Sequence, residues 1–131
     1  MSITVRGHVA HGNKLGRKLG FPTANILPGS LEAQDGVYVA RVRLNGAGEG
    51  HGRGHAAIAN LGVRPSVTGG NARVLEVHIF DFSDDIYGRQ MEVELVRFMR
   101  PEEHFASVDK LRMQIGRDVQ KAKEFFRTGN I

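Results

Sequence analysis

The sequence contains no cysteine and no tryptophan, and it has only two tyrosines and four prolines among 131 residues. The lack of cysteine excludes disulfides, thiol nucleophiles and cysteine-bound zinc, and it is typical of a reducing compartment. No apolar run approaches the roughly 18 residues of a membrane-spanning helix, and residues 1–6 lack the apolar core of a secretory signal. These absences predict a cytoplasmic protein with no membrane partner.

Glycine and basic residues stand out instead. There are 17 glycines, and 18 Lys and Arg residues against 14 Asp and Glu residues give a formal net charge of +4. This charge favours an anionic partner, but it does not distinguish a nucleic acid, a nucleotide and charges that simply face solvent. The length, with 40% hydrophobic residues, suits one domain with its own core, so we predict a single domain over residues 1–131.

Short segments rich in β-branched residues, bounded by Gly, Pro, Asn or Asp, predict strands. They are residues 3–9, 36–44, 55–61, 74–82 and 91–98. Because no helical pattern lies between them, parallel βαβ units are not expected. We predict an antiparallel sheet closed into a small barrel, since closure removes exposed strand edges.

The last quarter of the chain changes to a helical period. Ser107 is a suitable N-cap, and Gly129 ends the pattern. The interior Gly116 costs about 1 kcal/mol relative to alanine, so either something packs closely there or the position tolerates it. We expect this helix to cover one opening or flank of the barrel. The apolar stripe comprises Val108, Leu111, Ile115, Val119, Ala122 and Phe126.

Residues 11–25 combine glycines at positions 12, 16 and 20 with cations at positions 14, 17 and 18. Glycine lets the backbone approach a ligand, and backbone N–H groups beside cations can cradle a phosphate. The spacing matches neither the Walker A sequence nor the Rossmann fingerprint. A basic surface loop is therefore an equally open interpretation.

The end of this segment is stiffer. Pro22 fixes its own backbone and restricts Phe21 to an extended conformation. Thr23 and Asn25 then point to the same side, and their oxygens suit Mg²⁺ or phosphate. The alternative is an ordinary turn in which both side chains bond the local backbone.

A carboxylate lies within the predicted strand 74–82. Glu76 and His78 share one face, whereas Leu75 and Val77 share the other. Because both faces look buried, we expect Glu76 to lie among apolar neighbours, where desolvation would suit it to general-base chemistry. A salt-bridged or solvent-facing glutamate remains the alternative, and His78 is interpreted as structural.

A glycine-rich stretch covers residues 46–55 and joins two predicted strands. We interpret it as a hairpin loop. His51 and His55 invite a metal interpretation, but no acidic residue or cysteine accompanies them at a recognised ligand spacing.

Taken together, these features resemble the riboflavin kinase family over nearly the whole chain. A Phe-Pro-Thr-Ala-Asn motif followed about 50 residues later by Glu-x-His-Ile is a specific combination. The fold expected from the resemblance is mainly β, a closed antiparallel Greek-key barrel of about six strands with a C-terminal α-helix packed on it. The matching residues include Gly20-Phe21-Pro22-Thr23-Ala24-Asn25, Ala59-Asn60-Leu61-Gly62, Glu76-Val77-His78-Ile79, Arg100-Pro101-Glu102, Phe105 and the Leu111, Gln114 and Asp118 helix.

The resemblance implies transfer of the γ-phosphate of ATP to the 5′-hydroxyl of riboflavin, which gives FMN and ADP. It assigns Glu76 as the catalytic base, and it assigns Thr23 and Asn25 to Mg²⁺ and the ATP phosphates. Arg100 and Phe105 would hold the flavin. The expected ATP-binding residues are Gly12, Gly16, Arg17, Pro22, Thr23 and Asn25.

In bacteria such a module is commonly the C-terminal part of a bifunctional FAD synthetase. No nucleotidyltransferase sequence precedes the predicted barrel, and residues 8–11 do not match its His-x-Gly-His motif. We therefore expect this chain to make FMN but not FAD, with an FMN adenylyltransferase domain as a possible missing partner. A further departure is Ser66, where the family usually has threonine.

Two other functions are weighed against the kinase. A non-catalytic flavin or nucleotide sensor of the same fold would not need Thr23, Asn25 and Glu76 together. A basic barrel that binds nucleic acid would stack bases on exposed aromatic side chains. The few aromatic residues lie mostly in apolar runs, so we expect no nucleic-acid partner.

Overall fold

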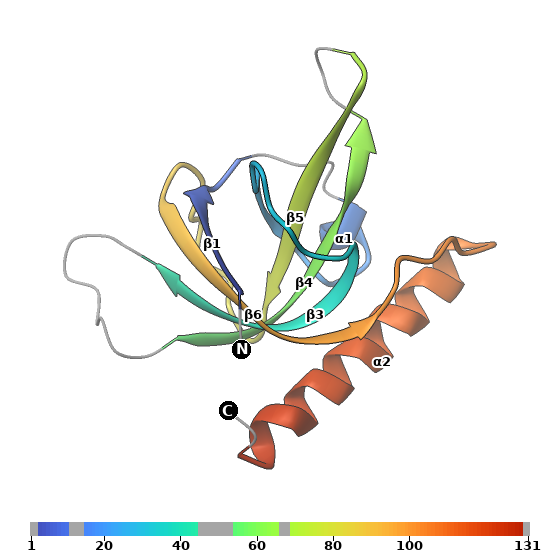
Figure 1. Cartoon of the computed structure of the whole chain (residues 1–131). Coiled ribbons are helices and arrows are strands. Elements are labelled where there is room, and N and C mark those ends of the chain that lie inside the picture. The colour runs from blue at the N-terminus through green and yellow to red at the C-terminus, as the bar shows by residue number, and fades with distance from the viewer. Residues whose placement is uncertain (1–2, 11–14, 45–53, 66–68, 130–131) are drawn as a thin grey trace.

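The computed structural model describes residues 3–10, 15–44, 54–65 and 69–129. They form one six-stranded sheet that curls into a half-barrel, with a long C-terminal helix lying across its outer side (Figure 1). The strands are β1 (Ile3–His8), β2 (Ala24–Ile26), β3 (Gly36–Leu44), β4 (His55–Pro65), β5 (Asn71–Ile79) and β6 (Gln90–Arg100), and the helices are α1 (Leu15–Lys18) and α2 (Val108–Arg127).

All neighbouring strands pair antiparallel, in the order β1-β6-β3-β4-β5-β2. Strands β3, β4 and β5 are consecutive neighbours, and β6 returns to lie beside β3, which is the Greek-key order. The edge strands β1 and β2 come close, since a Cβ on Gly7 would lie 3.3 Å from Cβ of Ile26. Just beyond β1, Ala10 and Asn25 form an isolated bridge. The predicted antiparallel Greek-key architecture is confirmed, as a curled half-barrel.

The main core fills the inside of the curl. Alternate side chains of β3, β4, β5 and β6 point inward, as the period of two requires. A second apolar cluster lies on the outer face of the sheet, where α2 covers it with Val119 and Ala122. Among the described residues, the largest fully buried side chains are Ile26, Leu61, Leu75, Met91, Val42, Val77 and Val93.

Helix α2 agrees with the sequence prediction at both ends. The Ser107 hydroxyl accepts a hydrogen bond from the Lys110 amide at 3.1 Å, and Gly129 has a φ of 74° beyond the last turn. A Cβ on Gly116 would find Phe21 Cζ at 4.0 Å, an ordinary contact distance. Of the two explanations for this glycine, the structure supports tolerance of the position. None of the helices in the described residues is long and apolar enough to span a membrane.

The segment between β1 and β3 contains more regular secondary structure than the sequence predicted. It was expected to contain neither a strand nor a helix over residues 11–25, but it includes the short helix α1 and the edge strand β2. The predicted strand over residues 74–82 is wrong beyond Ile79, because Asp81 has a φ of 53° and turns the chain. Phe80 still packs on the outer face beside His78, with a centroid distance of 5.9 Å, whereas Phe82 packs against the main core. Gly12, Ser66 and most of the glycine-rich stretch, residues 46–53, lie outside the described residues.

Candidate functional site

Two neighbouring cavities are lined by described residues of the sheet and helices. The smaller, of about 310 Å³, lies beside β2 and is lined by Arg17, Pro22, Thr23, Asn25 and residues 82–87. The larger, of about 560 Å³, lies between the outer face of the sheet and α2. Among the residues lining it are Thr23, Asn60, Arg64, Glu76, Arg100, Phe105 and Asp118.

Thr23 lines both cavities, so it lies at their junction. The chain leading to it is fixed from the neighbouring strand. Nδ1 of His78 on β5 donates a hydrogen bond to the Pro22 carbonyl at 2.8 Å. The ring of Phe21 packs edge-on against His78 with a centroid distance of 5.5 Å. Together these contacts attach the Phe-Pro-Thr segment to the strand that carries Glu76.

The pKa of His78 is lowered from its ordinary value. Burial is the largest cause, and the nearby Lys123 acts in the same direction, whereas the bond to Pro22 and the charge of Asp81 oppose them. At neutral pH the ring is therefore uncharged. Because a carbonyl can only accept, the proton of the neutral ring is on Nδ1.

Three polar residues form a row across neighbouring strands. Asn25 on β2 is the direct register partner of Glu76 on β5, and Glu76 is also the direct partner of Asn60 on β4. Direct partners in an antiparallel ladder project from the same face of the sheet. Glu76 therefore has a carboxamide on each side, and the row links the motif of residues 21–25 to the Glu-x-His motif.

Asn25 carries an unused ligand atom. Its side chain is buried, and among the described residues Oδ1 has no hydrogen-bond partner. A buried oxygen in this condition is unfavourable until a ligand or ion satisfies it. No group of three or more His, Cys, Asp or Glu able to hold a metal occurs in the described part of the chain. The oxygens of Asn25 and Thr23 thus fit a cation that brings most of its ligands with it, as a phosphate-bound Mg²⁺ does.

Glu76 has a charged neighbour, contrary to the expectation of apolar surroundings. Arg64 Nη2 lies 2.9 Å from Oε1 of Glu76, and Arg64 Nη1 lies 3.0 Å from Oε1 of Glu102. Burial acts to lower the pKa of Arg64, but the two carboxylates outweigh it and raise that pKa. Arg64 therefore stays charged and holds the Glu76 carboxylate in place against the segment that follows β6.

The far wall of the larger cavity is built around a second ion pair. Arg100, at the end of β6, donates from Nε and Nη2 to the carboxylate of Asp118 on α2, with a shortest distance of 2.8 Å. Gln114 donates to the same carboxylate at 3.0 Å. Arg100 Cζ also lies 5.8 Å from the centre of the Phe105 ring. A cation and an aromatic ring are thereby fixed side by side at the cavity.

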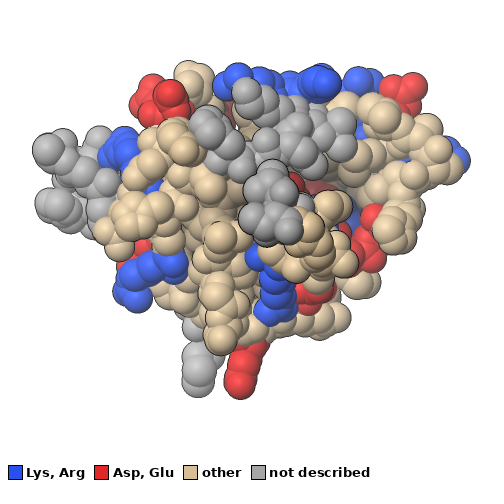
Figure 2. Space-filling model, turned by 90° about the horizontal axis from the view of Figure 1, so that it is seen from above, with Lys and Arg blue, Asp and Glu red and all other residues tan. Residues whose placement is uncertain are grey.

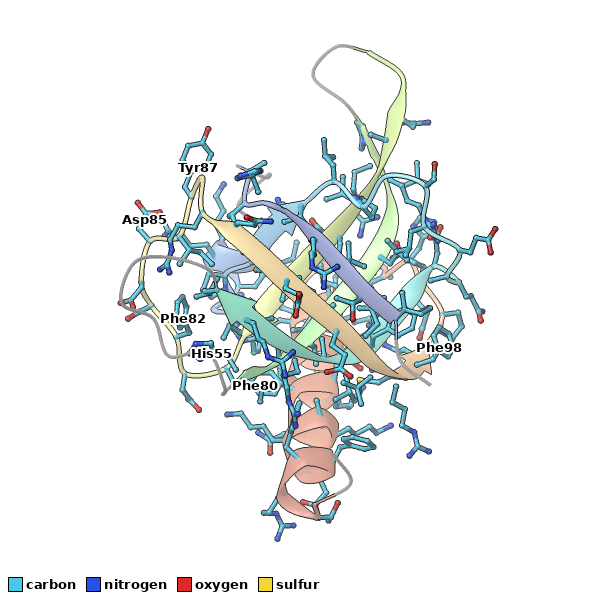
Figure 3. All side chains as sticks on the ribbon, turned by 60° about the vertical axis from the view of Figure 1, so that its left-hand side comes forward. His55, Phe80, Phe82, Asp85, Tyr87 and Phe98 are labelled. Carbon is cyan, nitrogen blue, oxygen red and sulfur yellow. The ribbon has the colours of Figure 1, made fainter. Side chains whose placement is uncertain are left out.

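The smaller cavity has a mixed rim. Phe82, Asp85 and Tyr87 lie together at one end of the sheet, on the side opposite Phe98 (Figure 3). Asp85 Oδ1 accepts a hydrogen bond from the Tyr87 amide at 3.0 Å, and this bond shapes the turn. Aromatic side chains and a cation from α1, Arg17, thus surround a cavity that also contains the Asn25 carboxamide.

Charged side chains of both signs lie on the face of the molecule that is seen from above (Figure 2). Several basic side chains lie next to one another along its upper edge, with acidic side chains at either end of that row. Further basic and acidic side chains lie among uncharged residues lower on the same face.

The structure groups the predicted site residues into two sets. Arg17, Pro22, Thr23 and Asn25 line the smaller cavity, whereas Glu76, Arg100 and Phe105 line the larger one. Gly16 lies within α1, and Gly12 is outside the described residues.

The sequence reasoning gave no role to Asn60, Arg64 or Asp118. For Asp118 there was a signal, because an acidic residue lies on the apolar side of α2 between Ile115 and Ala122. An acidic residue in that position needs a buried partner. The importance of Asn60 and Arg64 depends on strand register, which no local pattern reveals.

Sequence comparison relates this chain to proteins of one enzyme family. Residues 1–126 match the model of the family described as Flavokinase: Riboflavin kinase. The bifunctional riboflavin kinase/FMN adenylyltransferase of Haemophilus influenzae is 47% identical over 93% of this chain, and that of Escherichia coli K12 is 45% identical over 95%. The chain spans 38% of the length of each of these relatives.

Solved structures with a similar fold include the following two. A macrolide-efflux protein from Streptococcus pneumoniae has a TM-score of 0.77 and 34% identity, and the match covers 92% of this chain and 38% of that one. Riboflavin kinase from Trypanosoma brucei has a TM-score of 0.69 and 22% identity, with 98% and 79% covered. The family match over residues 1–126, together with the curled Greek-key sheet and its C-terminal helix, shows that this chain belongs to the riboflavin kinase family.

Proposed function

We propose that this domain transfers the γ-phosphate of ATP to the 5′-hydroxyl of riboflavin, producing FMN and ADP. The observation that carries the proposal is the position of Thr23 at the junction of the two cavities, with Glu76 lining the larger one. Two separate cavities that meet suit two substrates, and phosphoryl transfer requires chiefly that the substrates be positioned against each other.

ATP occupies the smaller cavity in this proposal. Arg17 offsets the phosphate charge, while the oxygens of Thr23 and Asn25 hold Mg²⁺. When bound, Mg²⁺ neutralises charge on the β- and γ-phosphates. The buried and unpaired Oδ1 of Asn25 supports this assignment.

Riboflavin occupies the larger cavity. Its volume of about 560 Å³ is typical of small-molecule sites, and its walls combine apolar residues of the sheet and α2 with a few polar groups. The flavin ring lies near Arg100 and Phe105, and the ribityl chain extends toward Glu76 and Thr23. This orientation brings the terminal hydroxyl to the junction.

Glu76 acts as the general base. As the 5′-oxygen forms its bond to the γ-phosphorus, the bond from that phosphorus to the β-phosphate oxygen breaks and ADP leaves. The hydroxyl proton passes to the carboxylate of Glu76, whose position is fixed by Arg64. A base of this kind contributes about 10²–10⁴-fold to the rate.

The first test incubates purified protein with riboflavin, ATP and Mg²⁺ and separates the flavins and nucleotides by chromatography. FMN and ADP in equal amounts are expected, without FAD. Tight binding of riboflavin without any FMN would instead indicate a sensor that keeps the fold. We further propose that the domain works beside an FMN adenylyltransferase domain, because the relatives named above carry both activities in their names. Supplying that domain should then allow FAD to form.

A further inference from the structure

Asn60 is a polar residue of the larger cavity that has no role in the assignments above. It lies in the middle of β4, half-buried, and its register partners are Glu76 on one side and Val37 on the other. Its side chain projects from the same outer face as Glu76, since direct partners of an antiparallel ladder do so.

The carboxamide of Asn60 is not satisfied within the described residues. Its Oδ1 is buried and has no hydrogen-bond partner there. Buried polar atoms are nearly always paired, so an exception needs an explanation. The other such side-chain atom identified in the described residues is Oδ1 of Asn25, on the opposite side of Glu76. Both unpaired amides therefore flank the same carboxylate.

The two amides face different cavities. Asn25 lines the smaller cavity, whereas Asn60 lines only the larger one, together with Glu76. Neighbouring strands lie about 4.7–4.9 Å apart, so Asn60 is one strand spacing from Glu76 on the side away from Asn25. A polyol chain whose terminal hydroxyl is at Glu76, and whose ring system occupies the larger cavity, passes beside Asn60.

We propose that the Asn60 carboxamide hydrogen-bonds a secondary hydroxyl of the polyol chain of the acceptor substrate and thereby selects a polyol-bearing flavin. This inference rests on the proposed function. The terminal torsion of asparagine is broad, so a rotation about Cβ–Cγ turns Oδ1 into the cavity. The carboxamide has both a donor and an acceptor, and a hydroxyl can pair with either.

The test is a cycle between enzyme variants and substrate analogues. Wild type and Asn60→Leu are assayed with riboflavin and with analogues that lack a single hydroxyl, at C3′ or C4′, but keep the 5′-hydroxyl. In wild type, loss of the contacted hydroxyl should lower kcat/KM by about tenfold, as for one hydrogen bond. In Asn60→Leu, kcat/KM for riboflavin should itself be about tenfold lower than in wild type. The variant's kcat/KM for the same analogue should then equal its kcat/KM for riboflavin.

Asn71→Leu is the matched control. Asn71 is an exposed asparagine at the start of β5, and it does not line either cavity. This variant should discriminate among the analogues as wild type does. The proposal is overturned if Asn60→Leu discriminates against both analogues by the wild-type factors.

Two further measurements test the contact if Asn60→Leu does not fold or if turnover is absent. Asn60→Ser is the smaller alternative to leucine, and it should show a smaller loss of discrimination between riboflavin and the same analogue. Flavin affinities, measured by fluorescence quenching, give the same cycle without turnover. If wild type makes no FMN, the proposed function fails, while a coupling in the affinities would still support the Asn60 contact. If the effects of Asn60→Leu and of removing the hydroxyl on flavin affinity are additive, the proposed contact is wrong.

Discussion

Arg100 and Asp118 join the end of the last strand to the middle of the C-terminal helix. Their side chains are only 17% and 4% exposed, and the guanidinium donates to both carboxylate oxygens. Burial tends to lower the pKa of Arg100, but the hydrogen bonds and charge of Asp118 more than compensate, so this pKa is raised. The pair attaches α2 to the sheet at the wall of the larger cavity.

Asp118→Asn should therefore destabilise the protein by about 2 kcal/mol, because it removes a charged hydrogen-bond acceptor from a buried arginine. The free energy of unfolding, measured with denaturant, checks this. Asp109→Asn on the same helix is the control. Asp109 is 84% exposed and pairs with a surface residue, Arg112, so its loss should cost less than about 1 kcal/mol. Equal losses in the two variants would contradict the structural importance of the pair.

Glu76→Gln should lower kcat by about 10²-fold or more, because the amide cannot accept the substrate proton. Flavin binding should be retained, since the glutamine oxygen still accepts the hydrogen bond from Arg64. Steady-state FMN formation and flavin fluorescence titration separate the two effects. Glu32→Gln, an exposed change in the β2–β3 connection, should leave both unchanged. Wild-type turnover in Glu76→Gln would remove Glu76 from the mechanism.

Two glycines should respond in opposite ways to alanine. At Gly116 in α2 a Cβ has room, so Gly116→Ala should stabilise the protein by about 0.5–1 kcal/mol. At Gly36 the φ is 148° and a Cβ would overlap the Arg100 carbonyl oxygen and the Phe98 ring. Gly36→Ala should therefore destabilise by more than about 1 kcal/mol. The Tm of both variants, measured by thermal unfolding, checks this. A change of Tm in the same direction in both variants would contradict the prediction for one of the two positions.

The stability of the protein should fall in mild acid because of His78. Its pKa is lowered in the folded state, so the unfolded chain binds more protons than the folded one between that pKa and the ordinary value of 6.5. The contribution of the neutral ring is complete above about pH 6.5 and is lost as the pH falls through this window. Unfolding free energies measured between pH 7.5 and 5 should show this slope. His78→Asn should reduce the slope, whereas His104→Asn, at an exposed position, should leave it unchanged.

Much of the fold could be predicted because its signals are local. The C-terminal helix, its Ser107 cap and strand β3 depend on residues near in sequence, and the structure confirms these three. The predicted apolar stripe is wrong at Val108, whose side chain is exposed. The resemblance also implied a closed Greek-key barrel of about six strands, and the structure has this antiparallel order as a curled half-barrel. Strand β2 was missed because three residues are too few to show a period, and an edge pairing with β5 is what makes Ala24–Ile26 a strand.

The candidate site divides in the same way. The sequence by itself predicted Thr23 and Asn25 as candidates to hold a cation and Glu76 as a candidate base, because their chemical groups and spacing are properties of the chain. Only the tertiary structure decided that Asn25, Glu76 and Asn60 are direct partners on three strands. It also decided that Arg64 holds Glu76 and that Asp118 holds Arg100. These relationships depend on strand register and helix docking, which arise from contacts between segments far apart in the sequence.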